Sequence, residues 1–356
     1  MARAYLDWNA TAPLRPEARH AMADAMDIVG NPSSVHSEGR AAKSLVERAR
    51  TQLAVAIGCK PTGIVFTSGA TEAASVLSRL PEGHDVSVER TAHDALWSRS
   101  RTESAAIDGR TYAMGLANSE TGIVTEPPPK IDGQWQFGLA RADWLLLDAT
   151  QAVGKIPFSF AWSGADMAIV SAHKFGGPKG IGALIVREGL DIAALATGGG
   201  QEMGRRAGTE NLIGIAGFGA AAEAAGRDLA NGVWDEVAQL RNILETALSD
   251  GVNGTISVGK DGPRLPNTLC LIAPGWKGET QVMAMDLAGY AVSAGSACSS
   301  GKVRSSRVLQ AMGYDEGLAG QAIRISIGPG LTKDTVLRFA DVWLAHYAKI
   351  LARKAG

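Results

Sequence analysis

The chain has 356 residues, of which 46% are hydrophobic and 20% charged, and its formal net charge is −1. This composition is typical of a globular protein long enough for two domains, and it argues against nucleic acid or a membrane as the main partner. No apolar stretch approaches the roughly 20 residues that span a bilayer. The N-terminus lacks the apolar core of a secretory signal, and three scattered cysteines fit a reducing cytoplasm.

Helical patterns and short apolar strands alternate through the first part of the chain. Residues 17–29 and 38–57 carry apolar residues at helical spacing, and the segment 30–36 between them has the composition of a loop. Residues 63–73 predict a short strand, a turn of small residues and a helix. Further strands are expected near residues 85–88, 111–116, 144–147, 166–170 and 182–186. This alternation predicts an α/β fold with a parallel sheet covered on both faces.

The pattern changes after residue 230, where we place a domain boundary. Residues 210–230 are rich in alanine and glycine, and 234–249 predict an amphipathic helix. Later elements are expected to be a strand at 266–273, a helix at 278–288, a strand at 322–327 and a helix at 332–352. The run Pro127–Pro129 predicts a surface connection.

A turn of small residues lies at Thr67-Ser-Gly-Ala-Thr71-Glu72, between a strand and a helix. Such a turn presents free backbone N–H groups, and the helix dipole favours an anion there. The hydroxyl of Thr71 adds a donor. The same pattern is also typical of an ordinary helix N-cap, with Ser68 or Thr71 as the capping residue.

Two apolar runs end in polar residues: one ends at Asp148, and the other runs through Ser171-Ala-His-Lys174 into a glycine-rich turn. An acid and a lysine at neighbouring strand ends suggest pyridoxal phosphate (PLP). Ligands of open α/β sheets lie beyond the carboxyl ends of strands, so an acid there could pair with a protonated pyridine nitrogen. Lys174 could form a Schiff base, and Ser171 and His173 could donate to a phosphate. The alternatives are a capping role for Asp148 and an exposed loop for Lys174.

Cys298 lies in the flexible sequence Gly295-Ser-Ala-Cys-Ser-Ser-Gly301. We expect this thiol to be accessible, and accessibility and thiolate character decide reactivity. A loop cysteine can also be inert. Cys59 and Cys270 stand in apolar runs and are predicted to be packing residues.

Taken together, these pieces resemble the NifS/IscS-type cysteine desulfurases, which are PLP enzymes of the class V aminotransferase group. The resemblance runs nearly end to end. It rests on Tyr5-Leu-Asp-Trp-Asn-Ala-Thr11, Gly30-Asn-Pro-Ser-Ser-Val-His36, Phe66-Thr-Ser-Gly-Ala-Thr-Glu72, Thr91-Ala-His93, Asn118-Ser-Glu-Thr-Gly122, Asp148-Ala-Thr-Gln-Ala-Val-Gly154, Ser171-Ala-His-Lys174, Gly198-Gly-Gly-Gln-Glu202, Arg206-Ala-Gly-Thr209, Gly295-Ser-Ala-Cys298 and Ile323-Arg-Ile-Ser326.

The resemblance implies a fold. It is the PLP-dependent transferase fold type I, in which a large domain holds a mixed, mostly parallel seven-stranded sheet and a smaller α+β domain follows. The large PLP-binding domain would cover residues 14–230. Residues 1–13 and 231–356 would form the small domain, which carries the cysteine segment.

The resemblance also implies roles for the matching residues. The catalytic residues would be Lys174, Cys298 and His93, with Cys298 accepting sulfur from L-cysteine as a persulfide. Asp148 would pair with the pyridine nitrogen and Gln151 with the ring oxygen, while His93 would stack on the ring. The phosphate would be bound by Ala70, Thr71, Ser171, His173 and, from the second subunit of a homodimer, Thr209. Asn31 and Arg324 would hold the substrate carboxylate, because the arginine fork matches a carboxylate.

The chain departs from the pattern in places. Ser119 stands where the family has a second asparagine, expected near the ring oxygen, and the segments on either side of His93 are shorter. Residues 301–307 are more basic than usual, and Gly328-Pro-Gly330 replaces the common Gly-Arg. The predicted product is alanine, with sulfur passed to an acceptor protein for iron–sulfur cluster or thio-cofactor assembly. Alternatives are another class V reaction, such as a selenocysteine lyase or an aminotransferase-like activity, or a non-catalytic scaffold.

Overall fold

The computed structural model describes residues 3–81, 83–101, 109–295 and 305–355. The chain divides into two compact units, here called the large unit and the small unit. The large unit consists of residues 13–116 and 125–230, and the small unit of residues 1–12, 117–124 and 231–356. Unlike the boundaries expected from the sequence, this division places residues 117–124 in the small unit.

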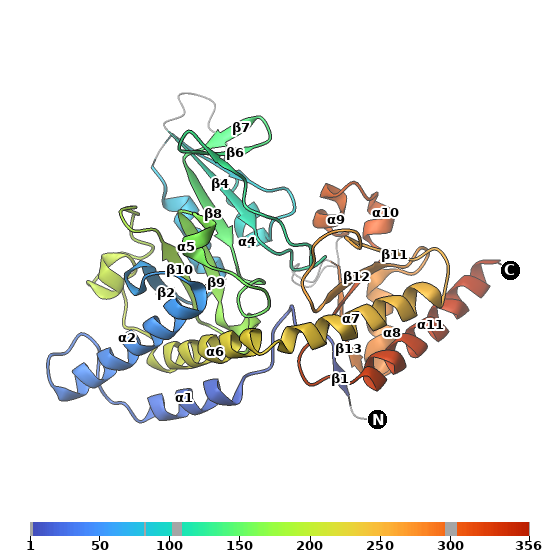
Figure 1. The fold of residues 1–356 in the computed structure, drawn as a ribbon, viewed down its shortest axis with the longest axis horizontal. Coiled ribbons are helices and arrows are strands. Elements are labelled where there is room, and N and C mark those ends of the chain that lie inside the picture. The colour runs from blue at the N-terminus through green and yellow to red at the C-terminus, as the bar shows by residue number, and fades with distance from the viewer. Residues whose placement is uncertain (1–2, 82, 102–108, 296–304, 356) are drawn as a thin grey trace. The chain divides into compact units, whose positions relative to one another are not determined.

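A six-stranded sheet forms the centre of the large unit (Figure 1). Its strands, in spatial order, are β2 (Ile64–Thr67), β10 (Gly182–Val186), β9 (Met167–Ser171), β8 (Trp144–Asp148), β4 (Gly109–Gly115) and β3 (His84–Val88). The neighbours from β9 to β3 are parallel, and β10 is antiparallel to both β9 and β2. Five strands therefore run in one direction, which confirms a mixed, mostly parallel sheet.

The strand count differs from the seven that the resemblance implies. At the β3 edge, Arg101 continues the sheet by a single antiparallel bridge to Val86, with backbone hydrogen bonds in both directions. The next residues, 102–108, lie outside the described part of the chain. Among the described residues the sheet thus has six strands, with this single bridge at its β3 edge.

Side chains alternate between the two faces of the central strands, and both faces are buried. One face carries Phe66, Leu147 and Val170 and packs against three helices. These helices are α1 (Pro16–Met26), α2 (Ser37–Ile57) and α6 (Leu212–Ala230). The other face carries Leu146 and Ile169 and is covered by the short helices α3 (Ala70–Ala73), η2 (Ala74–Arg79) and α4 (Asp94–Trp97). The predicted sheet covered on both faces is confirmed.

The long helices lie close to where apolar spacing predicts them. Helix α2 begins after His36, whose side chain accepts a hydrogen bond from the Gly39 N–H, and it ends at Gly58 with a positive φ of 68°. Both ends have the capping chemistry expected of a helix. Helix α1 ends at Met26, three residues before the predicted end.

A small three-stranded sheet between β4 and β8 was not predicted. It consists of β5 (Lys130–Ile131), β6 (Gln134–Phe137) and β7 (Ala140–Ala142). The first turn is Asp132-Gly133, with φ values of 51° and 82°. Asp-Gly between apolar residues is a strong hairpin signal, so the sequence did contain a sign of this element.

The small unit is built on an antiparallel sheet of four strands. In spatial order these are β11 (Ile256–Ser257), β12 (Thr268–Ile272), β15 (Ala322–Ser326) and β14 (Ser293–Ala294). The N-terminal strand β1 (Ala4–Tyr5) pairs in parallel with β13 (Tyr290–Ala291). The longer helices of this unit are α7 (Val233–Asp250), α8 (Gly278–Leu287) and α11 (Lys333–Ala355).

The segment 117–124 joins the small unit through its backbone. Val124 donates to the Pro263 carbonyl at 2.9 Å, and Leu265 donates to the Gly122 carbonyl at 2.7 Å. Gly122 has a positive φ of 74°, and a Cβ there would lie 2.7 Å from the Thr268 side chain, so glycine is required. Within the described part of the chain, no helix has the length and apolar character needed to cross a membrane.

Candidate active site

The topology of the large unit gathers the predicted cofactor residues at one edge of its sheet. Thr67 at the end of β2 and Ser171 at the end of β9 both pair with Gly182 at the start of β10. Asp148 ends the neighbouring parallel strand β8, opposite Ile169. Since carboxyl ends of strands with the same direction meet at one edge, the turn after β2, Asp148 and the Ser171–Lys174 segment share this edge.

Ser171, His173 and Lys174 follow one another where β9 ends and a 3-10 turn (Ala172–Lys174) begins. Ser171 is buried, whereas His173 and Lys174 are half-buried. Burial, and then the positive charges of Lys174, Lys179 and Lys155, lower the pKa of His173 to about 4. The imidazole is therefore neutral near pH 7, and a neutral ring can donate one N–H to an anion.

Asp148 is half-buried, and its Oδ1 accepts a hydrogen bond from the Thr150 N–H at 2.9 Å. The alternative prediction of a helix cap is wrong, because the described residues 150–155 after Asp148 form turns and no helix, so this bond stabilises a turn. Its Oδ2 has no hydrogen bond to the described residues. One carboxylate can therefore stabilise the turn and keep an oxygen available for a pyridinium nitrogen.

Gln151 is buried, and its Oε1 accepts a hydrogen bond from the Lys155 ammonium at 2.5 Å. Lys155 itself is only 1% exposed. Because the Lys155 ammonium can only donate, its partner atom must be the amide oxygen, and the positions of Oε1 and Nε2 are thereby fixed. The Nε2 end of Gln151 is then the end that can donate to another group, as the predicted contact with the ring oxygen requires.

His93 precedes α4 and caps it, since its Nδ1 accepts a hydrogen bond from the Ala95 N–H at 3.1 Å. In the neutral ring this places the proton on Nε2. The structure holds His93 beyond β3, in a half-buried position, with a fixed ring orientation.

The turn after β2 is held by polar contacts on both sides. The Thr67 hydroxyl donates to the Gly69 carbonyl at 3.0 Å, and the Glu72 carboxylate accepts from the Ser68 N–H at 2.6 Å. Burial raises the pKa of Glu72, but hydrogen bonds from Arg206 and Ser68 outweigh it and leave this pKa lowered. Ala70 and Thr71 therefore occupy the first turn of a helix whose entry is fixed.

Glycine at position 182 lets this turn approach the sheet. A Cβ there would lie 2.6 Å from the Val170 carbonyl oxygen and 2.7 Å from the Gly69 Cα. Both are backbone atoms, which cannot move aside as a flexible side chain can. Gly182 thus sets the distance between the Ser68–Thr71 turn and the end of β9.

Thr209 is exposed and lies near the same turn. It helps line a cavity of about 210 Å³ together with Thr67, Ser68 and Arg206. Arg206 forms an ion pair with Glu72 at 3.0 Å. The loop that carries Thr209 is thus attached to the turn with Ala70 and Thr71.

Asn31 lies in an exposed turn of the large unit, where its Oδ1 accepts a hydrogen bond from the Ser33 N–H at 2.9 Å. This contact fixes the local turn. Cys298 lies outside the described residues, so its predicted accessibility is untested.

The other two cysteines are free thiols. Burial raises the pKa of Cys59 and, with a smaller contribution from Glu120, that of Cys270 to about 12. Both are uncharged near pH 7 and are poor nucleophiles. The prediction that they are packing residues is confirmed most clearly for Cys270, which is completely buried.

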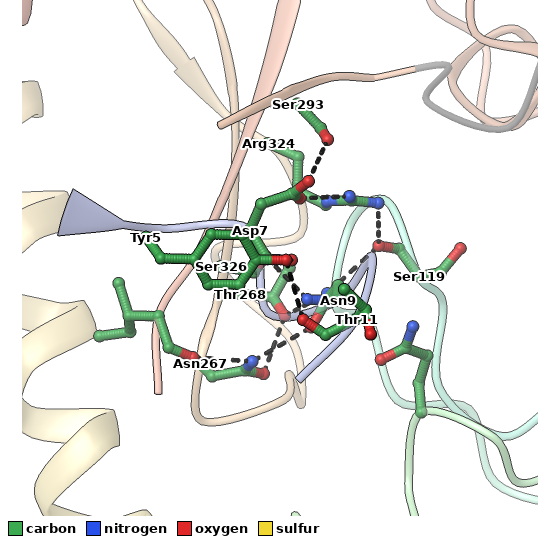
Figure 2. A network of polar contacts seen from close by, with 12 residues as sticks. Tyr5, Asp7, Asn9, Thr11, Ser119, Asn267, Thr268, Ser293, Arg324 and Ser326 are labelled. Carbon is green, nitrogen blue, oxygen red and sulfur yellow. Dashed lines mark hydrogen bonds and ion pairs between the residues drawn. The ribbon is translucent and has the colours of Figure 1, made fainter. Parts of the chain in front are cut away.

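Arg324 lies on β15 in the small unit, inside a network of polar contacts (Figure 2). It is 2% exposed. Its Nη2 donates to Asp7 Oδ1 at 2.7 Å and its Nη1 to the Ser119 carbonyl at 3.1 Å. The Nε–H of Arg324 is buried and has no hydrogen-bond partner among the described residues. An unsatisfied buried donor on a guanidinium is a suitable partner for a carboxylate.

Ser119, which stands where the family has a second asparagine, takes part in this network through its backbone. The carbonyl of Ser119 accepts from Arg324 and also from Asn9 Nδ2, at 3.2 Å. Asn118 accepts from the N–H groups of Glu120 and Thr121 through its Oδ1, which fixes the turn. The backbone at position 119 thus has a function that does not depend on its side chain.

Asp7 and Lys155 contact predicted site residues but were not themselves predicted to belong to the site. Lys155 stands four residues after Gln151, a spacing at which two side chains of a turn can meet, and this signal was available. The pairing of Asp7 with Arg324 joins positions 317 residues apart, so local pattern could not reveal it.

Comparisons with known proteins agree with this geometry. The family model "Aminotransferase class-V" matches residues 4–97 and 110–339. A NifS-like protein from Rickettsia africae, solved by X-ray diffraction, has a TM-score of 0.82 and 26% identity, over 98% of this chain and 99% of that chain. The fold is thus the one found in NifS-like proteins.

Curated relatives show to which branch of the family the chain belongs. A protein from a Frankia species named "Cysteine desulfurase" is 36% identical over 95% of this chain and 90% of the relative. "Cysteine desulfurase IscS" from Dictyoglomus turgidum is 32% identical over 95% and 93%. The chain belongs to the class-V aminotransferase family, on the branch of the NifS/IscS-type cysteine desulfurases, whose cofactor is PLP.

The residues at the sheet edge fit this cofactor. Asp148 offers an open carboxylate oxygen, Gln151 an oriented amide and Lys174 an amine, all at one edge of the sheet. The neutral His173, Ser171 and the first turn of α3 supply donors for a phosphate.

Proposed function

We propose that this chain is a PLP-dependent cysteine desulfurase that converts L-cysteine to L-alanine and receives the sulfur on Cys298. The observation that carries the proposal is the convergence of Lys174, Asp148 and Gln151 at one sheet edge, in a chain whose curated relatives are named cysteine desulfurases.

PLP would be held by residues of the large unit. Asp148 would pair with its ring nitrogen, Gln151 with its ring oxygen and Lys174 with its aldehyde carbon. Ala70, Thr71, Ser171 and His173 would bind its phosphate, His93 would stack on its ring, and Thr209 would come from the second subunit. When bound, the cofactor supplies an electron sink next to the substrate Cα.

The chain's own residues then perform the remaining steps. Arg324, with Asn31, binds the substrate carboxylate. Lys174 Nζ takes the Cα proton of the substrate and later returns a proton to its carbon skeleton. The Cys298 thiolate attacks the substrate sulfur, so the substrate C–S bond breaks, a new S–S bond forms, and the electron pair stays with the carbon skeleton. The products are alanine and a persulfide on Cys298.

We place this enzyme in the cytoplasm as a homodimer that hands its sulfur to an acceptor protein for iron–sulfur cluster or thio-cofactor assembly. The support is the set of relatives named above, one of which is named IscS. The free thiols of Cys59 and Cys270 fit a reducing compartment.

The test is alanine release from L-cysteine by the PLP-loaded protein. Wild type should release alanine together with sulfide or protein-bound persulfide, and both Lys174→Ala and Cys298→Ala should lose alanine release. Cys59→Ala is the matched control, because Cys59 is half-buried and packs against the core of the large unit, and it should retain activity. Full alanine production by Cys298→Ala would contradict the persulfide mechanism.

A further inference from the structure

Asp7 is a charged residue of the small unit that the mechanism above does not use. It follows strand β1 and forms a bridge with Ser326 on β15. Both of its carboxylate oxygens are occupied: Oδ1 accepts from Arg324 Nη2 at 2.7 Å, and Oδ2 accepts from the Ser293 hydroxyl at 2.8 Å. Figure 2 shows Asp7 between these two partners.

The partners of Asp7 are themselves held in register. Ser293 on β14 stands opposite Arg324 on β15 in the antiparallel pairing. The backbone of Asp7 is fixed as well, because its carbonyl accepts a hydrogen bond from the Tyr5 hydroxyl at 3.0 Å. The carboxylate of Asp7 therefore has little freedom to move.

This arrangement determines which edge of the Arg324 guanidinium remains available. Asp7 binds one terminal nitrogen and the Ser119 carbonyl binds the other, while the Nε–H has no partner in the part of the chain that the structure describes. The arginine side chain has many rotamers, so a fixed fork needs contacts of this kind. The negative charge of Asp7 also compensates the buried cation, so carboxylate recognition depends on directed hydrogen bonds more than on net charge.

We propose that Asp7 is a positioning residue that fixes the Arg324 guanidinium for the α-carboxylate of an amino-acid substrate. Through this contact it makes the site select amino acids over the corresponding amines without a carboxylate. The inference rests on the proposed function and deepens it, because it names a determinant of substrate class.

The test compares L-alanine, the proposed product, with ethylamine, which is the same molecule without the carboxylate. Binding of each to the PLP-loaded protein is followed by the absorbance of the bound cofactor. Asp7→Ala should weaken L-alanine binding by about tenfold, the order expected for loss of a charged hydrogen bond, and leave ethylamine binding within about twofold. In steady-state assays with L-cysteine, KM should rise more than kcat falls.

Three further variants make the test specific. Asp7→Asn keeps an acceptor oxygen for Arg324 and should restore most of the L-alanine affinity. Ser293→Ala leaves no buried charge uncompensated, so it should fold normally. It should also lose L-alanine affinity selectively, but by less than Asp7→Ala does. Glu245→Gln alters a separate carboxylate–arginine pair of the small unit, with Arg264, and should change neither affinity.

Two results would overturn the inference. One is an equal loss of L-alanine and ethylamine binding in Asp7→Ala and Ser293→Ala, which indicates a purely structural effect. The other is unchanged or tighter L-alanine binding in these variants, which indicates that compensation of charge outweighs positioning. Failure of the proposed function is distinguishable, because wild type itself would then release no alanine from L-cysteine.

Discussion

At the residue scale, contacts between side chains decide what the predicted site can do. Gln151 and Arg324 were both predicted from the sequence as site residues, but each is held by a partner that was not predicted. Lys155 fixes the amide of Gln151, and Asp7 fixes the fork of Arg324. Motifs indicate which residues face a ligand, whereas the residues that hold them appear only when the chain is folded.

His173 provides a prediction about pH. Its pKa in the folded protein is about 4, against 6.5 in the unfolded chain, chiefly because it is buried. Between these values the unfolded chain binds a proton that the folded protein does not, so the free energy of unfolding should fall as pH falls from 6.5 towards 4. His173→Gln should remove this part of the pH dependence from the PLP-free protein.

Denaturant unfolding of wild type and His173→Gln between pH 6.5 and 4 tests this pH dependence. The free-energy difference between wild type and His173→Gln should shift against wild type as the pH decreases. The exposed His20 supplies a matched control for the substitution itself, since His20→Gln exchanges the same residue types at a position open to solvent. A constant difference between wild type and His173→Gln across the window would contradict the expected cost of charging a buried imidazole.

At the element scale, the length and spacing of a pattern determine how much of it is predictable. Helices α2, α7 and α11 were located within a few residues, because many apolar residues at helical spacing reinforce one another. Strands β5 to β7 have two to four residues each, too few for alternation to be visible. Their Asp132-Gly133 turn was the one available signal, and its meaning depends on strands on both sides.

Gly182 supplies the prediction at this scale. The substitution Gly182→Ala places a Cβ against two backbone atoms, so it should destabilise the large unit by about 1–3 kcal/mol, as overpacking does. It should also weaken PLP binding, because the clash displaces Gly69 in the predicted phosphate turn. Denaturant unfolding and cofactor titration measure the two effects.

The control for this experiment is Gly226 in helix α6. A Cβ at Gly226 would meet nothing within 4 Å, so Gly226→Ala should leave cofactor binding unchanged and stabilise the helix slightly. Wild-type stability and PLP affinity in Gly182→Ala would show that the turn can move away from β10.

At the scale of the whole molecule, the boundaries of the two units could be predicted only where they coincide with a change in the sequence pattern. The boundary near residue 230 coincides with a change of pattern. By contrast, residues 117–124 belong to the small unit through pairing with residues far along the chain, such as Ile123 with Arg264. Pairings of this kind have no local signature, and the same applies to the bridge between Val86 and Arg101 at the edge of the large sheet.

The homodimer is the prediction that belongs to this scale. Sedimentation equilibrium of the purified protein should give twice the chain mass of 37.0 kDa. Because Thr209 is exposed and is proposed to complete the phosphate site of the second subunit, Thr209→Val should weaken PLP binding without changing this mass. A monomer with full alanine release would contradict both expectations.

The pairing of β1 with β13 has a consequence for biosynthesis. Ala4 is synthesised 286 residues before its partner Tyr290. At roughly 5–20 residues per second, the N-terminal strand waits on the order of 15–60 seconds for its partner. Residues 13–230 are complete before then, so the large unit can fold while the first strand, and Asp7 with it, is still unpaired.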